Sequence, residues 1–98
     1  MNITSNRDQN KLLAAVEGKI DTVTAPELEE FIKTNLDGVT ELTLDLSHTD
    51  YISSAGLRVL LLAQKRMITQ GTMEVINVNE TVNEIFEVTG FSDILTIR

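Results

Sequence analysis

The strongest constraint on the fold comes from residues 41–70, where the apolar pattern changes its period. Leu42, Leu44 and Leu46 alternate with polar residues, which is typical of a strand with one buried face. From Ser54 to Gln70 the apolar residues instead recur every three or four positions, as on an amphipathic helix. The apolar set of this helix is Leu57, Val59, Leu60, Leu61, Leu62, Ala63, Met67 and Ile68. A strand that leads into a long helix ending at Gly71 is therefore predicted.

The rest of the chain alternates between the same two patterns. Extended segments are expected at residues 2–7, 11–20 and 73–78, with a short strand or extended tail at residues 91–98. In the second of these, Leu13, Ala15 and Ile20 are predicted to share a face, and Gly18 is predicted to mark a bulge.

Two further helices are expected at residues 24–36 and 81–89. Thr24 is predicted to cap the first, with Pro26 in its opening turn. The spacing of Thr81 and Glu84 predicts a capping box at the start of the second, which would end at Gly90.

The resulting order is β-β-α-β-α-β-α-β, in which helices alternate with strands. Strand–helix–strand units favour parallel neighbours in one sheet. We therefore expect an α/β fold with a small mixed sheet of four to five strands and three to four helices. The chain has 98 residues, so residues 1–98 are expected to form a single domain.

Composition removes several classes of function. The chain has no Cys, which excludes disulfides, thiolate catalysis and Cys-ligated metals. Its net charge of −7 argues against a broad nucleic-acid interface or an acidic membrane surface as a partner. The first ten residues lack the apolar segment of a signal peptide, and no apolar run is long enough to span a bilayer, so a cytoplasmic location is expected. No cofactor or metal is expected.

Two adjacent serines, Ser53 and Ser54, stand where the long helix begins. One of them can cap the helix by accepting a backbone N–H, which leaves the second without a structural explanation. The first turn of a helix also favours an anion, and a phosphoryl group would bring about −1.5 to −2 charges at neutral pH. Gly56 leaves room there for a partner or a kinase to approach. The position is therefore a candidate for a phosphorylation switch.

Three segments, which follow one another in order between residues 18 and 95, resemble the STAS domain family, which includes bacterial anti-sigma factor antagonists. The segments are "GKIDTVTAPELEEF" (18–31), "LDLSHTDYISSAGLRVLLLAQKRM" (44–67) and "INVNETVNEIFEVTGFSDIL" (76–95). The usual phosphoacceptor motif of that family is Asp-Ser-Ser-Gly-Leu. Alignment on Gly56-Leu57 places Ser54 on the phosphorylated serine, puts Ser53 in place of the Asp and Ala55 in place of the second Ser.

The resemblance implies which residues meet a partner. Ser54 is the expected phosphoacceptor and Ser53 a secondary one. Asp21 matches an acidic residue near the phosphosite, and Thr24 lies in the same loop. The implied partner-binding set is Asp21, Thr24, Ser53, Ser54, Gly56, Leu57 and Arg58. If Arg58 and Leu62 are exposed, they border the docking face.

The resemblance also implies a mechanism without catalysis by this chain. The unphosphorylated protein would bind an anti-sigma factor that is also a serine kinase and so release the sigma factor. Phosphorylation of Ser54 would break the complex, and a serine phosphatase would restore it. Because the acidic residue before the acceptor is replaced by Ser53, a STAS scaffold or ligand sensor that is never phosphorylated stays an alternative.

A small serine hydrolase is the other alternative. Asp45, His48 and Ser54 could form a triad, but the Gly-x-Ser-x-Gly motif of a nucleophile elbow is absent, since Ile52 stands two positions before Ser54. Asp45 and Asp50 could hold a cation, although no recognised metal motif is present.

Overall fold

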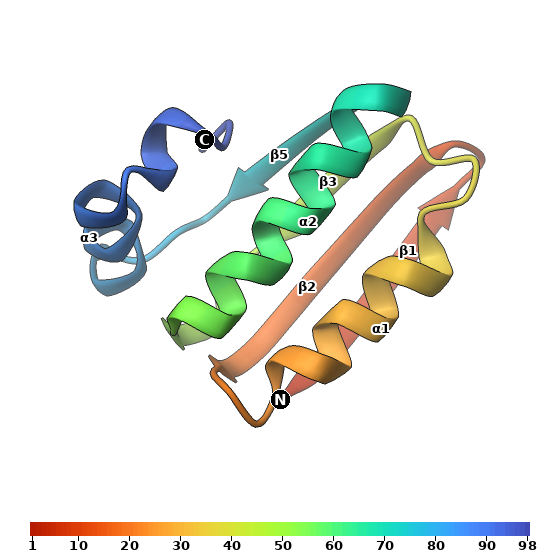
Figure 1. Ribbon diagram of the computed structural model, residues 1–98. Helices are drawn as coiled ribbons and strands as arrows, with labels where there is room; N and C mark the ends of the chain where they lie inside the picture. Colours follow the sequence, from red (N-terminus) through yellow and green to blue (C-terminus); the bar gives the residue numbers. More distant parts are fainter.

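The computed structural model describes residues 1–98 and has the predicted α/β architecture. Helices and strands alternate along the chain after an initial hairpin (Figure 1). The elements are β1 (Asn2–Asp8), β2 (Lys11–Ile20), α1 (Ala25–Asn35), β3 (Glu41–Asp45), β4 (Thr49–Ile52), α2 (Ser54–Gln70), β5 (Thr72–Ile76), α3 (Glu80–Thr89) and the 3₁₀ helix η1 (Phe91–Asp93). The mixed five-stranded sheet and the three α-helices confirm the predicted fold class.

The sheet is built around β2. Its strand order is β1-β2-β3-β5, with β1 antiparallel to β2 and the β2–β3 and β3–β5 pairs parallel. The last residues of β2 leave this sheet and pair in parallel with β4 instead, where Ile20 lies opposite Ile52. β2 therefore connects the main sheet to the short strand that leads into α2.

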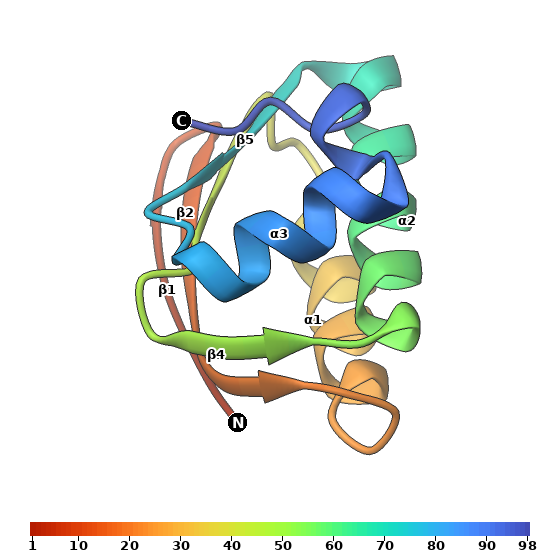
Figure 2. The same cartoon turned by 90° about the vertical axis from the view of Figure 1, so that its left-hand side faces the viewer.

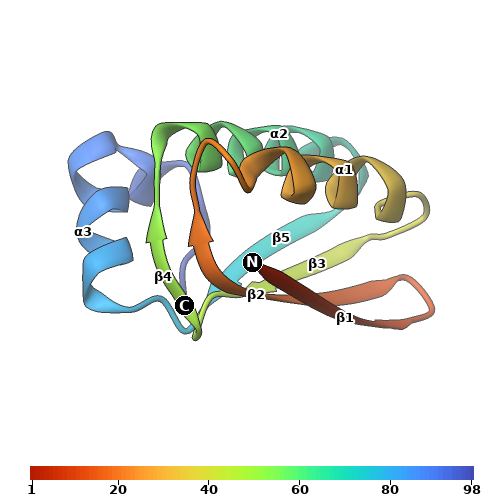
Figure 3. The same cartoon turned by 90° about the horizontal axis from the view of Figure 1, so that it is seen from below.

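Helices α1 and α2 lie side by side on one face of the sheet (Figures 1 and 3). Leu42, Leu44 and Leu46 are buried beneath them, which confirms the alternation predicted for this strand. The opposite face of the sheet carries no helix (Figure 3). Helix α3 packs beside β4 at one side of the molecule (Figure 2) and buries Phe86 in the core.

The face predicted for β2 is wrong. Leu12, Ala14 and Val16 point into the core, whereas Leu13 is 43% exposed on the uncovered face of the sheet. Both alternating sets of β2 are apolar, so periodicity alone cannot choose between them. Ile20 is buried, so it does not share a face with the exposed Leu13 as predicted. The register with β4 shifts between Gly18 and Lys19, where the bulge was predicted.

Strand β4 was not predicted, because the sequence pattern indicates a turn between a strand and the long helix at these residues. Thr49 is fully buried, and its hydroxyl donates to the Val16 carbonyl at 2.7 Å. This bond and the pairing with β2 hold a segment whose own sequence contains two polar residues in four.

The helix ends also differ from the predictions in detail. Thr24 is the N-cap residue of α1 as predicted, but its side chain makes no capping bond. Helix α3 is capped by Asn79, whose side chain accepts from the backbone N–H of Val82 at 2.8 Å, and Thr81 already lies inside the helix. In α2, Ile68 is 69% exposed rather than part of the buried face. Gly71 and Gly90 end α2 and α3 as predicted.

Residues 91–98, predicted as a short strand or an extended tail, are extended only in their last part. They begin with the turn of η1, and Ile97 then makes a single parallel bridge to Val75 beside β5.

Candidate functional site

The candidate site lies where β2 and β4 end together. Both strands rise from the sheet towards the helices and finish at the same edge (Figure 3). The backbone N–H of Ser53 donates to the Ile20 carbonyl at 2.8 Å, which ties the start of α2 to the end of β2. The loop that begins at Asp21 therefore meets the serine pair, although about thirty residues separate them in the sequence.

The structure separates the two serines into two roles. Ser53 is the N-cap of α2 and is half-buried; its Oγ accepts from the backbone N–H of Gly56 at 3.5 Å, a long and weak bond. Ser54 is the first residue of the helix and is exposed, and its hydroxyl makes no hydrogen bond within the protein. One serine thus caps the helix, and the other presents its oxygen to solvent at the positive end of the helix dipole.

Gly56 and Leu57 lie beneath this surface. A Cβ on Gly56 would stand 2.7 Å from Ile20 Cγ2 and 2.7 Å from Ile52 Cγ1, so only glycine lets α2 approach the two strand ends this closely. Leu57 is buried in the core. Both residues therefore support the site from below, and the exposed members of the predicted set are the ones placed to touch a partner.

The loop after β2 is an internally bonded turn. Asp21 Oδ1 accepts from the backbone N–H groups of Val23 and Thr24, each at 3.0 Å. The Thr24 hydroxyl donates to the Lys19 carbonyl at 2.7 Å and accepts from the Asp21 N–H at 2.9 Å. The N–H of Thr24, more than that of Val23, holds the pKa of Asp21 below its ordinary value. Asp21 is thus ionised at neutral pH, and its charge fixes the turn.

This turn exposes a residue that the sequence analysis did not single out. Val23 is 85% exposed at its tip. The available signal was an apolar residue inside an otherwise polar loop.

Arg58 forms the rim of the site on the side of α1. It is exposed and borders a shallow hollow of about 200 Å³ between the starts of α1 and α2. The hollow is lined by Thr22, Ala25, Pro26, Glu29, Ala55, Arg58 and Val59. It is an open surface feature, and its lining presents no pair of groups suited to acid–base chemistry.

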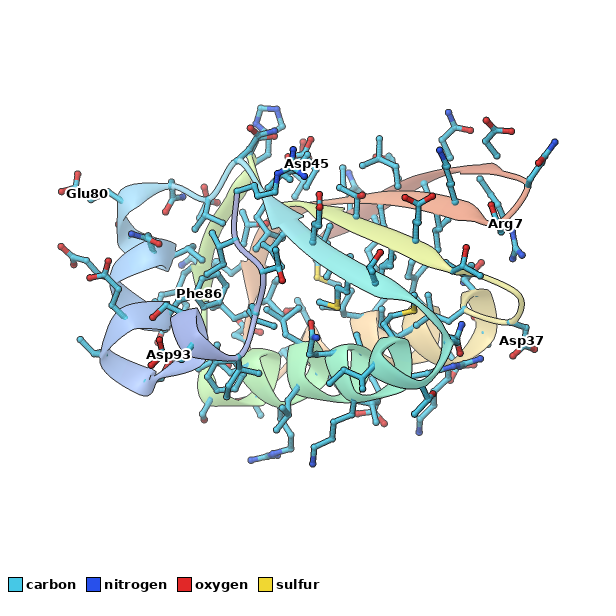
Figure 4. The ribbon with its side chains drawn as sticks, turned by 90° about the horizontal axis from the view of Figure 1, so that it is seen from above. Arg7, Asp37, Asp45, Glu80, Phe86 and Asp93 are labelled. Carbon is cyan, nitrogen blue, oxygen red and sulfur yellow. The ribbon has the colours of Figure 1, made fainter.

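The residues of the possible hydrolase are not brought together. His48 precedes β4 and Ser54 follows it, so the whole strand of four residues, roughly 13 Å long, lies between them. Asp45 lies on the far side of the molecule from α1 and α2 (Figure 4). Its Oδ1 accepts from the Ser47 N–H at 2.9 Å, which holds the pKa of Asp45 below its ordinary value.

Nothing in the structure gathers ligands for a metal. No group of three or more His, Asp or Glu side chains lies close enough to hold an ion. None of the helices combines the length and the apolar character needed to cross a bilayer.

Comparison with known sequences gives a family. The sequence model of the STAS domain matches residues 2–98. The chain is 35% identical over 99 residues to BtrV of Bordetella bronchiseptica, a protein named provisionally as an anti-sigma factor antagonist. This similarity covers 99% of the chain and 85% of BtrV.

Solved structures share the fold. An anti-sigma factor antagonist from Mycobacterium paratuberculosis superposes with a TM-score of 0.87 at 24% identity, over 98% of this chain and 83% of that one. The Bacillus cell-fate determinant SpoIIAA, in its phosphorylated form, superposes with a TM-score of 0.75 at 14% identity, over 99% of this chain and 91% of that one.

Proposed function

Because this chain belongs to the STAS domain family, we propose that it is an anti-sigma factor antagonist whose binding is switched off by phosphorylation of Ser54. The observation that carries the proposal is the exposed, unbonded Ser54 hydroxyl on the first turn of α2, beside the turn formed by Asp21 and Thr24. The names of the relatives support the class of partner, and the phosphorylated SpoIIAA shows that a protein of this fold can carry the modification.

The geometry suits a switch that leaves the fold intact. A phosphoryl group on Ser54 adds about −1.5 to −2 charges where the helix dipole favours an anion. Because the hydroxyl faces solvent, the modification displaces no core side chain. The partner's surface would meet a new dianion on a chain that already carries a net charge of −7. Binding is therefore lost through charge and bulk at the interface, with little movement of the backbone.

Ser54 is a better acceptor than Ser53 for a structural reason. Ser53 is half-buried, and its oxygen accepts from the backbone N–H of Gly56 in the first turn of α2. Phosphorylation of Ser53 would remove the cap of the helix that supports the site. Ser53 also occupies the place of the family's acidic residue, so kinase recognition here depends on other contacts.

The partners follow from this role. An anti-sigma factor with ATP-dependent serine kinase activity binds the unphosphorylated chain and releases its sigma factor. A metal-dependent serine phosphatase restores the active form. The nucleotide and the metal belong to these partners, and this chain itself catalyses no reaction. Such a system operates in the cytoplasm. The contact surface on this chain comprises Asp21, Val23, Thr24, Ser53, Ser54 and Arg58.

The test combines labelling with binding. The chain is incubated with ATP and its cognate anti-sigma factor kinase, and the modified peptide is mapped by mass spectrometry. We expect phosphate on Ser54, none on Ser53, and no labelling of Ser54→Ala. Ser54→Ala should bind the anti-sigma factor as the wild type does, and Ser54→Asp should bind more weakly. Equal binding by the two variants contradicts the switch.

A STAS scaffold that is never phosphorylated is the second candidate, and the replacement of the family's Asp by Ser53 favours it. It predicts partner binding with no labelling of either serine and no difference between Ser54→Ala and Ser54→Asp.

A further inference from the structure

Helix α2 is cationic in a chain that is otherwise acidic. Its 17 residues include Arg58, Lys65 and Arg66 and no Asp or Glu. The whole protein has 15 acidic and 8 basic residues. Three of the eight basic residues therefore lie on the helix that begins at Ser54, with no acidic residue among them.

Two of the three cations on α2 are not used by the fold. Salt bridges engage Lys11, Lys33, Arg66 and Arg98. Arg7 donates to the carbonyls of Gln9 and Asp37, at the end of the molecule opposite α3 (Figure 4). The side chains of Lys19, Arg58 and Lys65 make neither a salt bridge nor a hydrogen bond. Arg58 and Lys65 thus keep their full charge for an external partner.

These two cations lie on one side of α2 with an apolar residue between them. They are seven residues apart, which is two helical turns, and both line a hollow of about 300 Å³ between α1 and α2. Leu62 lines the same hollow and is 40% exposed. We call Arg58, Leu62 and Lys65 the α2 stripe. On the α1 side, Glu29 and Lys33 neutralise each other in a 2.8 Å ion pair.

We propose that the α2 stripe docks an acidic segment of the anti-sigma factor, with carboxylates at Arg58 and Lys65 and an aliphatic side chain on Leu62. This inference rests on the proposed function and names the chemistry that its partner must supply. Charge complementarity selects the occupant, because an acidic segment meets two unpaired cations here and acidic or paired residues over most of the remaining surface.

The stripe also explains how one phosphoryl group can reverse binding. Ser54 and Arg58 are four residues apart, so their side chains are neighbours on the helix surface. A dianion on Ser54 would draw the Arg58 guanidinium to itself and cancel most of the stripe's two positive charges. The partner's carboxylates would then lose a cation and face an anion in its place. Glu29 and the ionised Asp21 also lie at this end of α2 and add to the repulsion, which Lys19 beside Asp21 partly offsets.

The test removes positive charges from the α2 stripe and, as a control, the same number of positive charges from elsewhere on the surface. Affinity for the cognate anti-sigma factor is measured by calorimetry for Arg58→Gln, Lys65→Gln and the double variant. Lys11→Gln and Arg98→Gln, singly and together, are the matched controls, since they remove equal charge from exposed salt bridges outside α2. All the altered side chains are exposed, and circular dichroism checks that each variant is folded.

We expect the double stripe variant to bind about 10-fold more weakly and the double control to change less than about two-fold. The difference should shrink as the ionic strength rises from about 0.05 to about 0.5 M. If the two double variants lose equal affinity, or if the stripe variant loses none, the inference is overturned. Binding of the wild type to the anti-sigma factor would in that case still support the proposed function. Failure of the wild type to bind the anti-sigma factor refutes both. Binding of anionic vesicles or RNA through Arg58 and Lys65, in place of the protein, also overturns the inference.

Discussion

The closest packing in the site gives a prediction with a defined magnitude. Gly56 is the third residue of α2, and a Cβ at this position would meet Ile20 Cγ2 and Ile52 Cγ1 at 2.7 Å and the Ile20 carbonyl oxygen at 2.9 Å. Carbon atoms in contact prefer about 3.5–4.0 Å. The change Gly56→Ala therefore pushes α2 away from the ends of β2 and β4.

Two effects of opposite sign determine how much Gly56→Ala changes the free energy of unfolding. Overpacking of a rigid site costs about 1–3 kcal/mol. Alanine in place of glycine near a helix start returns up to about 1 kcal/mol of helix propensity. The free energy of unfolding should therefore fall by about 1–2 kcal/mol. For a domain of this size the melting temperature should fall by roughly 4–16 °C.

Urea unfolding followed by circular dichroism measures this loss directly. Ile52→Ala serves as the background for a double-mutant cycle, because it removes one of the two side-chain clashes. Gly56→Ala should cost less in that background than in the wild type. An unchanged or raised urea midpoint for Gly56→Ala would refute the claim that this glycine sets the approach of α2 to the strands.

Three further predictions concern the surroundings of the site. Asn79→Ala removes the cap of α3 and a bond to the Thr49 carbonyl, and should lower the free energy of unfolding by about 1–2 kcal/mol in urea titrations. Thr49→Val leaves the Val16 carbonyl without its buried donor, and should cost about 1–3 kcal/mol by the same assay. Asp21 and Asp45 bind protons more weakly in the folded state than in the unfolded state, where the pKa is about 3.9. The stability that these two carboxylates contribute should therefore be fully present above about pH 5 and be lost as the pH falls through their lowered pKa values. The urea midpoint of the double variant Asp21→Asn/Asp45→Asn should depend less on pH.

Sequence patterns predicted the elements well wherever local and tertiary preferences agree. Leu42, Leu44 and Leu46 alternate with polar residues, so only one face of that strand can be buried. The helix from Ser54 to Gln70 is long enough for its period to be unambiguous and ends at a glycine. These two segments position the candidate site, so the sequence alone could place the serine pair where the helix begins.

The wrong predictions concern segments in which two local arrangements are almost equally favourable. In β2 both faces are apolar, and the helices covering one of them decide that Leu12 rather than Leu13 is buried. Asn79 and Thr81 are both competent caps for α3, and the bond from Asn79 to the Thr49 carbonyl favours the first.

Other details depend on partners that are distant in the sequence. β4 is a strand only because β2 extends past Gly18 to pair with it. Thr24 has the residue type of an N-cap, but the Lys19 carbonyl and the Asp21 N–H already engage its hydroxyl. The division of roles between Ser53 and Ser54 likewise needs the backbone, because either serine could have been the cap.

The affinity of a chain carrying phosphoserine only at position 54 tests the central claim most directly. Genetic incorporation of phosphoserine gives this form without a kinase, and the same modification at Ser53 gives the comparison. Titrated into the anti-sigma factor, phosphoserine at position 54 should weaken binding about 100-fold or more, while circular dichroism and the melting curve stay close to those of the unmodified chain. Unchanged affinity for the folded, phosphorylated chain would contradict the account.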